Sequence, residues 1–253
     1  GGWDSVWFGY APREVAGFAG ARRTVARNLL HTVSVRGVVL DDLRSRGLYD
    51  RPTSVRDGRL WDDISEAPMS TEFAISRFLV PHLAGSGWAI FMDSDMLVRE
   101  SLGHLFNLAD PSKAVMVVKH QYDPPEGIKM DGQAQTRYAR KNWSSVMLFN
   151  CDHPANQALT VDLINSAPGR DLHAFKWLPD ELIGELDPRW NYLVGHTTGV
   201  PDPAVVHFTS GIPSMAGYGE CEFAGEWRKE LLRWAAGDIM SSPRPTRAAG
   251  RKP

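Results

Sequence analysis

Two aspartates interrupt the strongly apolar run AIFMDSDMLV at residues 89–98, where only Ser94 separates Asp93 from Asp95. A carboxylate that is buried without a partner costs several kcal/mol or stays protonated. In an extended segment residues i and i+2 point the same way, so both carboxylates would lie side by side where the strand leaves its sheet. Such hard oxygen ligands suit Mg²⁺ or Mn²⁺, with a diphosphate in other positions. The alternative is a solvated strand end that caps the next helix.

A histidine follows a second apolar run, AVVHF at residues 204–208. The neutral imidazole of His207 also suits Mn²⁺, and the small residues Thr209, Ser210 and Gly211 after it could present backbone N–H groups to phosphate. A lone histidine after a buried strand is more often a hydrogen-bonded core residue. The residues alone leave both roles open.

Two further polar groups border apolar segments. Asn142, Ser144 and Ser145 precede the apolar run VMLFN, so they would lie at the entry edge of a strand. They could bind sugar hydroxyls or, as turn residues, satisfy their own backbone. Asp180 and Glu181 stand between apolar neighbours in WLPDELIGEL. They could lie beneath a reacting carbon or merely favour the start of a helix.

The elements that would position these residues alternate between strands and helices. Strands are predicted at residues 6–10, 32–40, 88–92, 114–119, 145–150 and 204–208, and helices at 14–30, 70–82, 102–108, 154–166 and 226–236. This order predicts an α/β domain with a parallel sheet, whose ligands gather at the carboxyl ends of the strands. Residues 50–67 and 121–140 are predicted loops, and the second is long enough to bind an acceptor or act as a lid.

Composition excludes several classes of protein. The 253 residues are 43% hydrophobic and carry a net charge of −2, so no overall field attracts nucleic acid or a membrane surface. No apolar stretch of about 18 residues predicts a membrane span, and no secretory signal is visible. Cys151 and Cys221 lack metal-ligand spacing and are predicted to be free thiols in the cytoplasm. A domain at 3–240 and a disordered basic tail at 241–253 are expected.

The order of the motifs resembles the GT-A nucleotide-sugar glycosyltransferases, and most of all family 8 and its bacterial relatives. The likeness covers roughly residues 6–214. FMDSDMLV matches the D-x-D strand of the family, SRFLVPHL its arginine-bearing helix and SSVMLFN its asparagine-terminated strand. LPDELIGELDPRWN matches its D-Q-D followed by W-N, and VVHF matches its final histidine.

This resemblance implies a single GT-A domain, with a central mixed, mostly parallel sheet flanked by helices. It implies transfer of a hexose-type unit from a nucleoside diphosphate sugar, expected to be a UDP-sugar, to a hydroxyl acceptor with retention of configuration. The acceptor would be a glycan, a lipid-linked group or a small molecule. The enzyme would need Mn²⁺ or Mg²⁺, bind no nucleic acid, and work in the cytoplasm or peripherally at the inner membrane surface.

The resemblance also implies roles for individual residues. The metal ligands would be Asp93, Asp95 and His207. The donor would contact Phe8, Gly9, Tyr10, Arg77, Asp93, Ser94, Asp95, Asn142, Ser144, Ser145 and Gly211. The residues near the anomeric carbon would be Asp180 and Glu181, and the acceptor site is expected at Lys119, His120, Lys129 and Trp177.

Two departures from the family pattern leave alternatives open. The family usually follows its histidine with Gly and a Lys-Pro-Trp that grips the diphosphate, but residues 212–215 contain no lysine, so the countercharge must come from elsewhere. Glu181 stands where the family commonly has glutamine. A non-catalytic sugar-nucleotide-binding module is therefore an alternative. A haloacid dehalogenase-like phosphatase is another, although Met96 and Leu97 depart from its motif.

Overall fold

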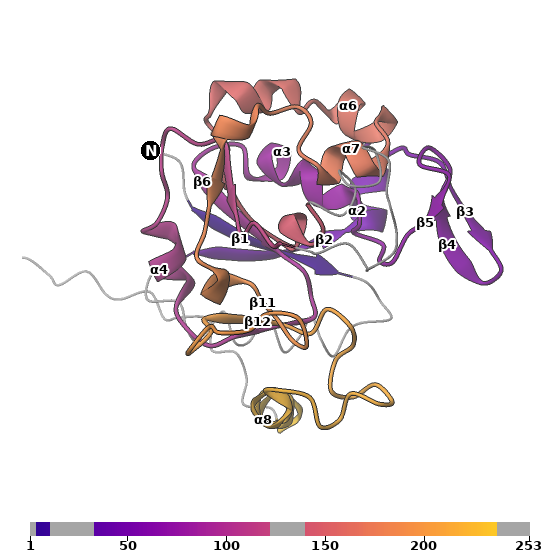
Figure 1. Ribbon diagram of the computed structural model, residues 1–253. Coiled ribbons are helices and arrows are strands. Elements are labelled where there is room, and N and C mark those ends of the chain that lie inside the picture. Colours follow the sequence, from indigo (N-terminus) through magenta and orange to yellow (C-terminus); the bar gives the residue numbers. More distant parts are fainter. Residues whose placement is uncertain (1–3, 11–32, 122–139, 237–253) are drawn as a thin grey trace, which may run out of the picture.

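A six-stranded mixed sheet forms the centre of the computed structural model, which describes residues 4–10, 33–121 and 140–236 (Figure 1). The strand order is β10-β8-β9-β6-β1-β2. These strands are β1 (Ser5–Tyr10), β2 (Ser34–Val39), β6 (Trp88–Met92), β8 (Val115–Val117), β9 (Val146–Asn150) and β10 (Ile183–Glu185). β1 is parallel to β2 and β6, β10 is parallel to β8, and β9 runs antiparallel to both of its neighbours. The expected mixed, mostly parallel sheet is confirmed.

The central strands are apolar throughout because both faces of the sheet are covered. Successive side chains of a strand point to opposite faces. In β6, Ala89 and Phe91 pack into one hydrophobic cluster, and Ile90 and Met92 pack into a second cluster on the other face. The same alternation holds in β1, β8 and β9. Continuous apolar runs thus identified these strands correctly.

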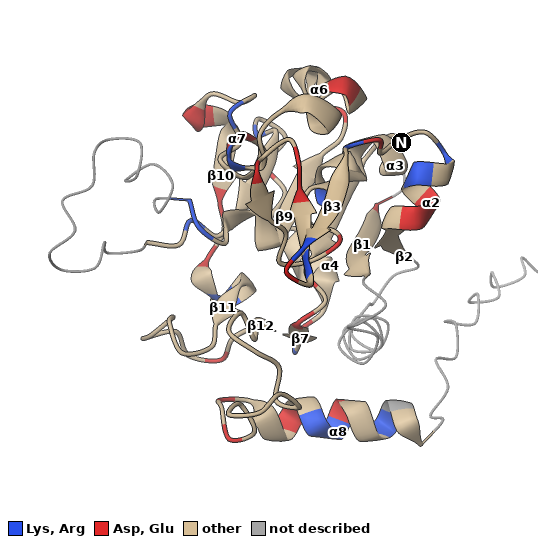
Figure 2. Ribbon diagram, turned by 90° about the vertical axis from the view of Figure 1, so that its right-hand side faces the viewer, with Lys and Arg blue, Asp and Glu red and all other residues tan. Residues whose placement is uncertain are grey.

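The two faces of the sheet are covered by different elements (Figures 1 and 2). One face carries α2 (Leu40–Ser45), the 3₁₀ helix η2 (Ser76–Leu79), α3 (Val80–Ala84), α6 (Val161–Ser166) and α7 (Gly169–His173). The other carries α4 (Leu102–Phe106), a small sheet in the order β11-β12-β7, and α8 (Ala224–Ala235) beyond it. The strands of the small sheet are β7 (Met96–Val98), β11 (Tyr192–Leu193) and β12 (Val205–His207). No helix of the described residues combines the length and hydropathy that crossing a membrane requires.

Short elements complete the described chain. They are β3 (Thr53–Arg56), β4 (Arg59–Asp62), β5 (Ala67–Pro68), and the 3₁₀ helices η3 (Trp143–Ser145), η4 (Pro154–Ala158), η5 (Asp180–Leu182) and η6 (Pro188–Trp190). The predicted helix at 154–166 is divided between η4 and α6 because Thr160 caps a new helix start, its hydroxyl accepting the Leu163 N–H. Cys151 and Cys221 are free, as expected. The predicted helix at 14–30 and the predicted tail at 241–253 lie outside the described residues.

The prediction of a loop at residues 50–67 is wrong. This segment forms the antiparallel sheet β3-β4-β5, which projects from the body of the structure (Figure 1). Asp57 and Gly58 both have positive φ, 51° and 72°, between the paired Arg56 and Arg59. An Asp-Gly pair is a strong signal for a two-residue hairpin turn, and it outweighs the polar composition of the segment.

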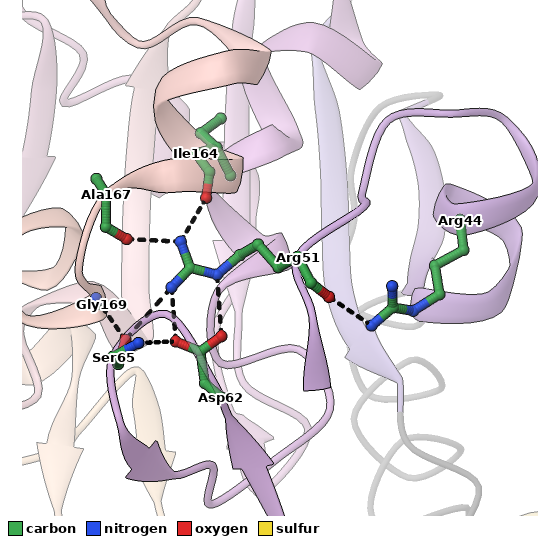
Figure 3. Close-up of polar contacts among 7 residues, drawn as sticks. All are labelled: Arg44, Arg51, Asp62, Ser65, Ile164, Ala167 and Gly169. Atoms are coloured by element: carbon green, nitrogen blue, oxygen red, sulfur yellow. Dashed lines mark hydrogen bonds and ion pairs between the residues drawn. The ribbon is translucent and has the colours of Figure 1, made fainter. Parts of the chain in front are cut away.

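A buried ion pair ties this hairpin sheet to α6 and α7 (Figure 3). Arg51 and Asp62 are fully buried and make a bidentate contact, with N–O distances of 3.1 and 2.6 Å. The Arg51 guanidinium also donates to the carbonyls of Ile164 and Ala167 at 2.9 and 2.6 Å, which cap the end of α6. Ser65 accepts the Gly169 N–H at 2.8 Å, so the start of α7 is attached to the same group.

Replacing Asp62 with alanine should destabilise the fold strongly, because Arg51 would stay buried as an uncompensated charge. The expected loss in unfolding free energy is about 3–5 kcal/mol, measured by urea denaturation. Asp63 is a matched control, since it pairs at 3.7 Å with the exposed Arg56. Asp63→Ala should cost less than about 1 kcal/mol. Equal losses in the two variants would contradict the role given to the buried pair.

Acid should weaken the Arg51–Asp62 contact. Burial acts to raise the pKa of Asp62, but hydrogen bonds from Arg51 and Ser65 outweigh it and hold the pKa below its ordinary value. The carboxylate therefore stabilises the fold fully above its unfolded pKa, about 3.9, and the contribution is lost as pH falls through the lower folded value. The stability difference between wild type and Asp62→Ala should shrink below about pH 4. A difference that did not change with pH would argue against this assignment.

Candidate active site

Three side chains that could hold a metal ion, those of Asp93, Asp95 and His207, meet where β6 ends. Asp93 directly follows β6 and Asp95 directly precedes β7. Because β12 pairs antiparallel with β7, His207 lies opposite Met96 and its imidazole reaches the two aspartates. The His207 Nε2 atom is 3.0 Å from an Asp95 oxygen and 3.7 Å from an Asp93 oxygen. One ligand atom from each residue lies within 4.8 Å of the others.

The electrostatics of this cluster favour an added positive charge. Burial raises the pKa of Asp93 above its ordinary value, and the neighbouring Asp95 charge acts in the same direction. Burial acts to lower the pKa of His207, but the carboxylates of Asp95 and Asp93 outweigh it and the pKa is raised. Two carboxylates and one imidazole are a donor set that fits a divalent ion such as Mn²⁺ or Mg²⁺.

A buried arginine holds Asp93 in place. Arg77, in η2, lies 2.8 Å from an Asp93 carboxylate oxygen and donates to the Ser144 carbonyl at 3.0 Å. Its Nε–H is shared between the carbonyls of Phe73 and Ala74 at 3.2 and 3.1 Å. The guanidinium carbon also lies 4.9 Å from the centre of the Phe91 ring. Arg77 is therefore fixed on several sides and presents its charge to the metal-ligand cluster.

The polar residues before β9 join this cluster. Ser145 accepts the Asp93 N–H on its carbonyl at 3.0 Å, which extends the pairing of β6 with β9. Its hydroxyl donates to the Asn142 carbonyl at 2.7 Å and accepts from Asn191 at 2.8 Å. The Ser144 hydroxyl lies 2.6 Å from Nδ1 of His173. Asn142 has a left-handed φ of 63°, which turns the chain into η3.

A cavity of about 540 Å³ opens beside Asp93. Its lining residues are Ser70, Arg77, Asp93, Arg140, Lys141, Asn142, Ser144, Ser145, Arg170, Asp171, His173, Ala174 and Lys176. Five of the predicted donor-binding residues (Arg77, Asp93, Asn142, Ser144 and Ser145) are therefore among the residues that line it. The volume is ample for a sugar, and the lining offers carboxylates, hydroxyls and basic groups.

The wall that α7 contributes to the cavity was missed by sequence reasoning. Arg170 and His173 lie three residues apart in α7, a spacing that brings side chains to one side of a helix, and Lys176 follows shortly after α7 ends. That spacing is the signal that would have indicated them. Burial lowers the pKa of His173 to about 3, with Arg77 acting in the same direction, so its imidazole is neutral at neutral pH.

Asp180, one of the predicted catalytic pair, lies at the edge of this region. Asp180 begins η5 and forms an ion pair with Arg140, which lines the cavity. Glu181 is exposed, and its backbone carbonyl accepts from Lys113 at 2.7 Å. Within the described part of the chain, the Glu181 carboxylate makes no hydrogen bond of its own.

Two predicted ligand contacts pack within the protein. Phe8 is fully buried in the core cluster that also holds Ile90, so its side chain is not available to a nucleotide base. The ring of Trp177 packs edge-on against Phe78, and its indole N–H donates to Asn156 at 3.1 Å. Both side chains are held by packing, and their contacts with the donor and the acceptor stay predictions.

The remaining predicted residues surround the site. A Cβ on Gly9 would lie 2.3 Å from the Phe73 ring, and one on Gly211 would lie 2.6 Å from the Tyr218 ring, so both glycines are required by close packing. Ser94 is buried and Tyr10 is half-buried. Lys119 lies over the Trp143 ring at 5.8 Å.

Among the predicted acceptor residues, His120 lies near His207 of the candidate metal site. Burial lowers the pKa of His120 to about 4, and the nearby charge of His207 acts in the same direction. The His120 carbonyl accepts the indole N–H of Trp143 at 3.0 Å. Lys129 lies outside the described residues.

Solved glycosyltransferase structures share this fold. No model of a known protein family matches the chain. The bifunctional glycosyltransferase WbbM is 12% identical with a TM-score of 0.61, covering 91% of this chain, which spans half of the WbbM chain. GlyE of Streptococcus pneumoniae is 12% identical with a TM-score of 0.58, covering 92% of this chain and 62% of GlyE. The galactosyltransferase LgtC, solved with donor and acceptor sugar analogues, is 14% identical with a TM-score of 0.57 over 90% of this chain and 95% of its own.

A relative by sequence comes from a plant. Protein CDI of Arabidopsis thaliana is 39% identical over 232 residues, which cover 89% of this chain and 85% of the relative. The chain has the GT-A fold of nucleotide-sugar glycosyltransferases and belongs to the family of Protein CDI.

Proposed function

We propose that this protein is a metal-dependent glycosyltransferase that moves a hexose-type sugar from a nucleoside diphosphate sugar to a hydroxyl acceptor. The observation that carries the proposal is the cluster of Asp93, Asp95 and His207, which opens next to a polar cavity at the carboxyl end of β6. Ligands of open α/β sheets bind at this edge. UDP as the nucleotide and retention of configuration are part of the proposal and rest on the resemblance to family 8.

In the proposed site, three residues bind the metal ion, and Arg77 orients one of them and supplies positive charge. Asp93, Asp95 and His207 would hold the divalent ion, which when bound neutralises the diphosphate and acts as a Lewis acid on the leaving group. Arg77 keeps Asp93 oriented and brings a buried positive charge to the place where the leaving group gains negative charge. This charge supports catalysis in a chain that lacks the usual diphosphate-binding lysine.

The sugar of the donor would lie along the residues that precede β9. Ser144 and Ser145 line the cavity beside Asp93, and Asn142 extends this polar surface. The Ser144 and Ser145 hydroxyls can orient sugar hydroxyls, because each can accept a further hydrogen bond beyond its contacts within the protein. Asp180 and Glu181 remain the proposed carboxylates near the anomeric carbon. The ion pair of Asp180 with Arg140 links η5 to the rim of the cavity and supports this proposal.

A non-catalytic sugar-nucleotide-binding module is the second candidate, and the absence of the lysine favours it. Both candidates bind nucleotide and metal, but only the enzyme breaks the sugar–phosphate bond. Incubation with UDP-glucose, UDP-galactose and UDP-N-acetylglucosamine plus Mn²⁺, without acceptor, separates them. Slow release of UDP that stops on chelation supports the transferase, whereas Mn²⁺-dependent binding with no release from any donor, with or without a set of hydroxyl acceptors, would support the binding module.

Asp95→Ala should abolish Mn²⁺-dependent nucleotide binding and leave the fold intact. At a UDP concentration of one hundred times the dissociation constant, bound ligand stabilises the wild type by about 2.7 kcal/mol. The variant should lose this increment in a thermal-shift assay with UDP and Mn²⁺. The exposed Asp41, at the start of α2, is the control, and Asp41→Ala should respond to UDP as the wild type does. An unchanged metal dependence in Asp95→Ala would place the metal elsewhere.

Glu181→Gln should lower the turnover number by about 10²–10³-fold with little change in donor affinity, if the carboxylate stabilises a positively charged transition state. Glu185→Gln is a matched control because Glu185 is an exposed glutamate four residues further along, in β10. A covalent nucleophile would instead lose nearly all turnover, and a glycosyl adduct on Glu181 would be visible by intact mass in the wild type. Turnover near the wild-type rate in Glu181→Gln would leave only the structural role of an acidic residue at a helix start.

A further inference from the structure

Positive charge is concentrated in the cavity beside Asp93. Five basic side chains line it (Arg77, Arg140, Lys141, Arg170 and Lys176) against two acidic ones, although the chain as a whole carries a net charge of −2. His173, in the same lining, is neutral because burial lowers its pKa to about 3. An excess of one sign in a concave site raises the local concentration of ligands of opposite charge.

Arg170, in α7, and Lys176, which follows α7, lie away from the cluster of Asp93, Asp95 and His207. Figures 1 and 2 show α7 on one face of the central sheet, beside α6, and β12 with His207 on the other face. The cavity lining includes Asp93 but neither Asp95 nor His207, and from Asp93 it extends towards α7. A diphosphate held at the metal would therefore occupy one end of the site, and Arg170 and Lys176 would lie at the other.

The charges at the α7 end are only partly balanced within the protein. Arg170 and Lys176 share one carboxylate, that of Asp171, at 3.8 and 2.9 Å. Two cations against one anion leave one net positive charge in this group. Both basic side chains are more than half exposed, 62% and 58%, while Asp171 is 29% exposed. Their charged groups can thus meet a ligand without first losing a buried partner.

The neighbouring surface of the cavity fits a sugar. The Ser144 hydroxyl contacts His173, which lies three residues from both Arg170 and Lys176. The Ser144 hydroxyl, which could bind a sugar, and the two cations therefore line one cavity. A ligand that met both would carry sugar hydroxyls on one side and an anionic group on the other.

We propose that Arg170 and Lys176 bind a carboxylate or phosphate carried by the sugar substrate that fills the cavity, in addition to the diphosphate at the metal. This inference rests on the proposed glycosyltransferase function and names the substrate class as an anionic sugar. The anionic group can belong to the donor sugar, as in a uronic acid, or to the acceptor, as in a sugar phosphate. The simpler reading of the two residues is a solvated basic surface, which would bind neutral and anionic sugars equally.

The test compares matched pairs of ligands on the full chain. For the donor, UDP-glucose is compared with UDP-glucuronate in the presence of Mn²⁺. For the acceptor, glucose is compared with glucose 6-phosphate in the presence of UDP and Mn²⁺. Dissociation constants are measured by calorimetry for the wild type and for Arg170→Gln/Lys176→Gln. The control is Arg46→Gln, because Arg46 is 54% exposed, pairs with Asp42 at 3.5 Å and lies in the C-cap of α2 outside the cavity.

The wild type should bind the anionic member of one pair about tenfold more tightly than the neutral one, and the double variant should lose this preference. Its affinity for UDP alone and for the neutral sugar should stay within about twofold of the wild type, and Arg46→Gln should keep the preference. The pair that shows the effect identifies whether donor or acceptor carries the anion. Equal affinity for neutral and anionic members in both pairs would overturn the inference, as would a preference that survives in the double variant.

The same measurements distinguish a failure of the proposed glycosyltransferase function from a failure of the anionic-sugar inference alone. If the wild type bound neither UDP nor any UDP-sugar in the presence of Mn²⁺, the glycosyltransferase proposal would fail, and the inference would fail with it. If UDP bound with Mn²⁺ dependence but no pair of sugars were distinguished, the proposed function would stand and only the anionic substrate would be excluded.

Discussion

The site depends on the contact between the buried guanidinium of Arg77 and the carboxylate of Asp93. A carboxylate at the end of an apolar strand is unstable in its charged form unless a partner compensates it. Arg77 supplies the partner for Asp93 and is itself held by the carbonyls of Phe73, Ala74 and Ser144. The apolar run that ends in Asp93 is therefore compatible with folding because an arginine from another segment reaches it. The same contact joins η2, β6 and the start of β9 into one surface.

A second buried arginine, Arg51, supports the other wall of the cavity in a similar way. Arg51 uses its guanidinium to join Asp62, in β4, to the carbonyl end of α6, and Ser65 attaches the first N–H of α7. A Cβ on Gly169 would lie 2.9 Å from Ile75, so α7 also packs closely against the segment that carries Arg77. The two arginine networks thus fix the two sides of the cavity relative to each other, and each does so without contributing an exposed group.

Sequence reasoning identified the central strands and the three residues of the candidate metal site because both leave strong local signals. A continuous apolar run such as VMLFN in β9 reports burial on both faces, and Asp-x-Asp after such a run has few structural explanations. It failed where the local signal was weak or opposed. The Asp-Gly turn signal at Asp57–Gly58 lies in a polar segment that favours a loop, and α7 is only five residues long, too short to leave a clear helical pattern. The burial of Phe8 and the packing of Trp177 against Phe78 depend on contacts that one sequence does not indicate.

The single antiparallel strand of the main sheet has a consequence for how this site can change. Because β9 runs opposite to β8 and β6, the chain leaves β8 and re-enters β9 at the same edge, the edge that carries Asp93. Residues 118–145 therefore begin and end beside the cavity. Insertions or deletions within this connection need not shift the register of any described strand, because both of its ends lie at one edge of the sheet. A family with this sheet can therefore vary the length of the connection while the strands that position Asp93 stay the same.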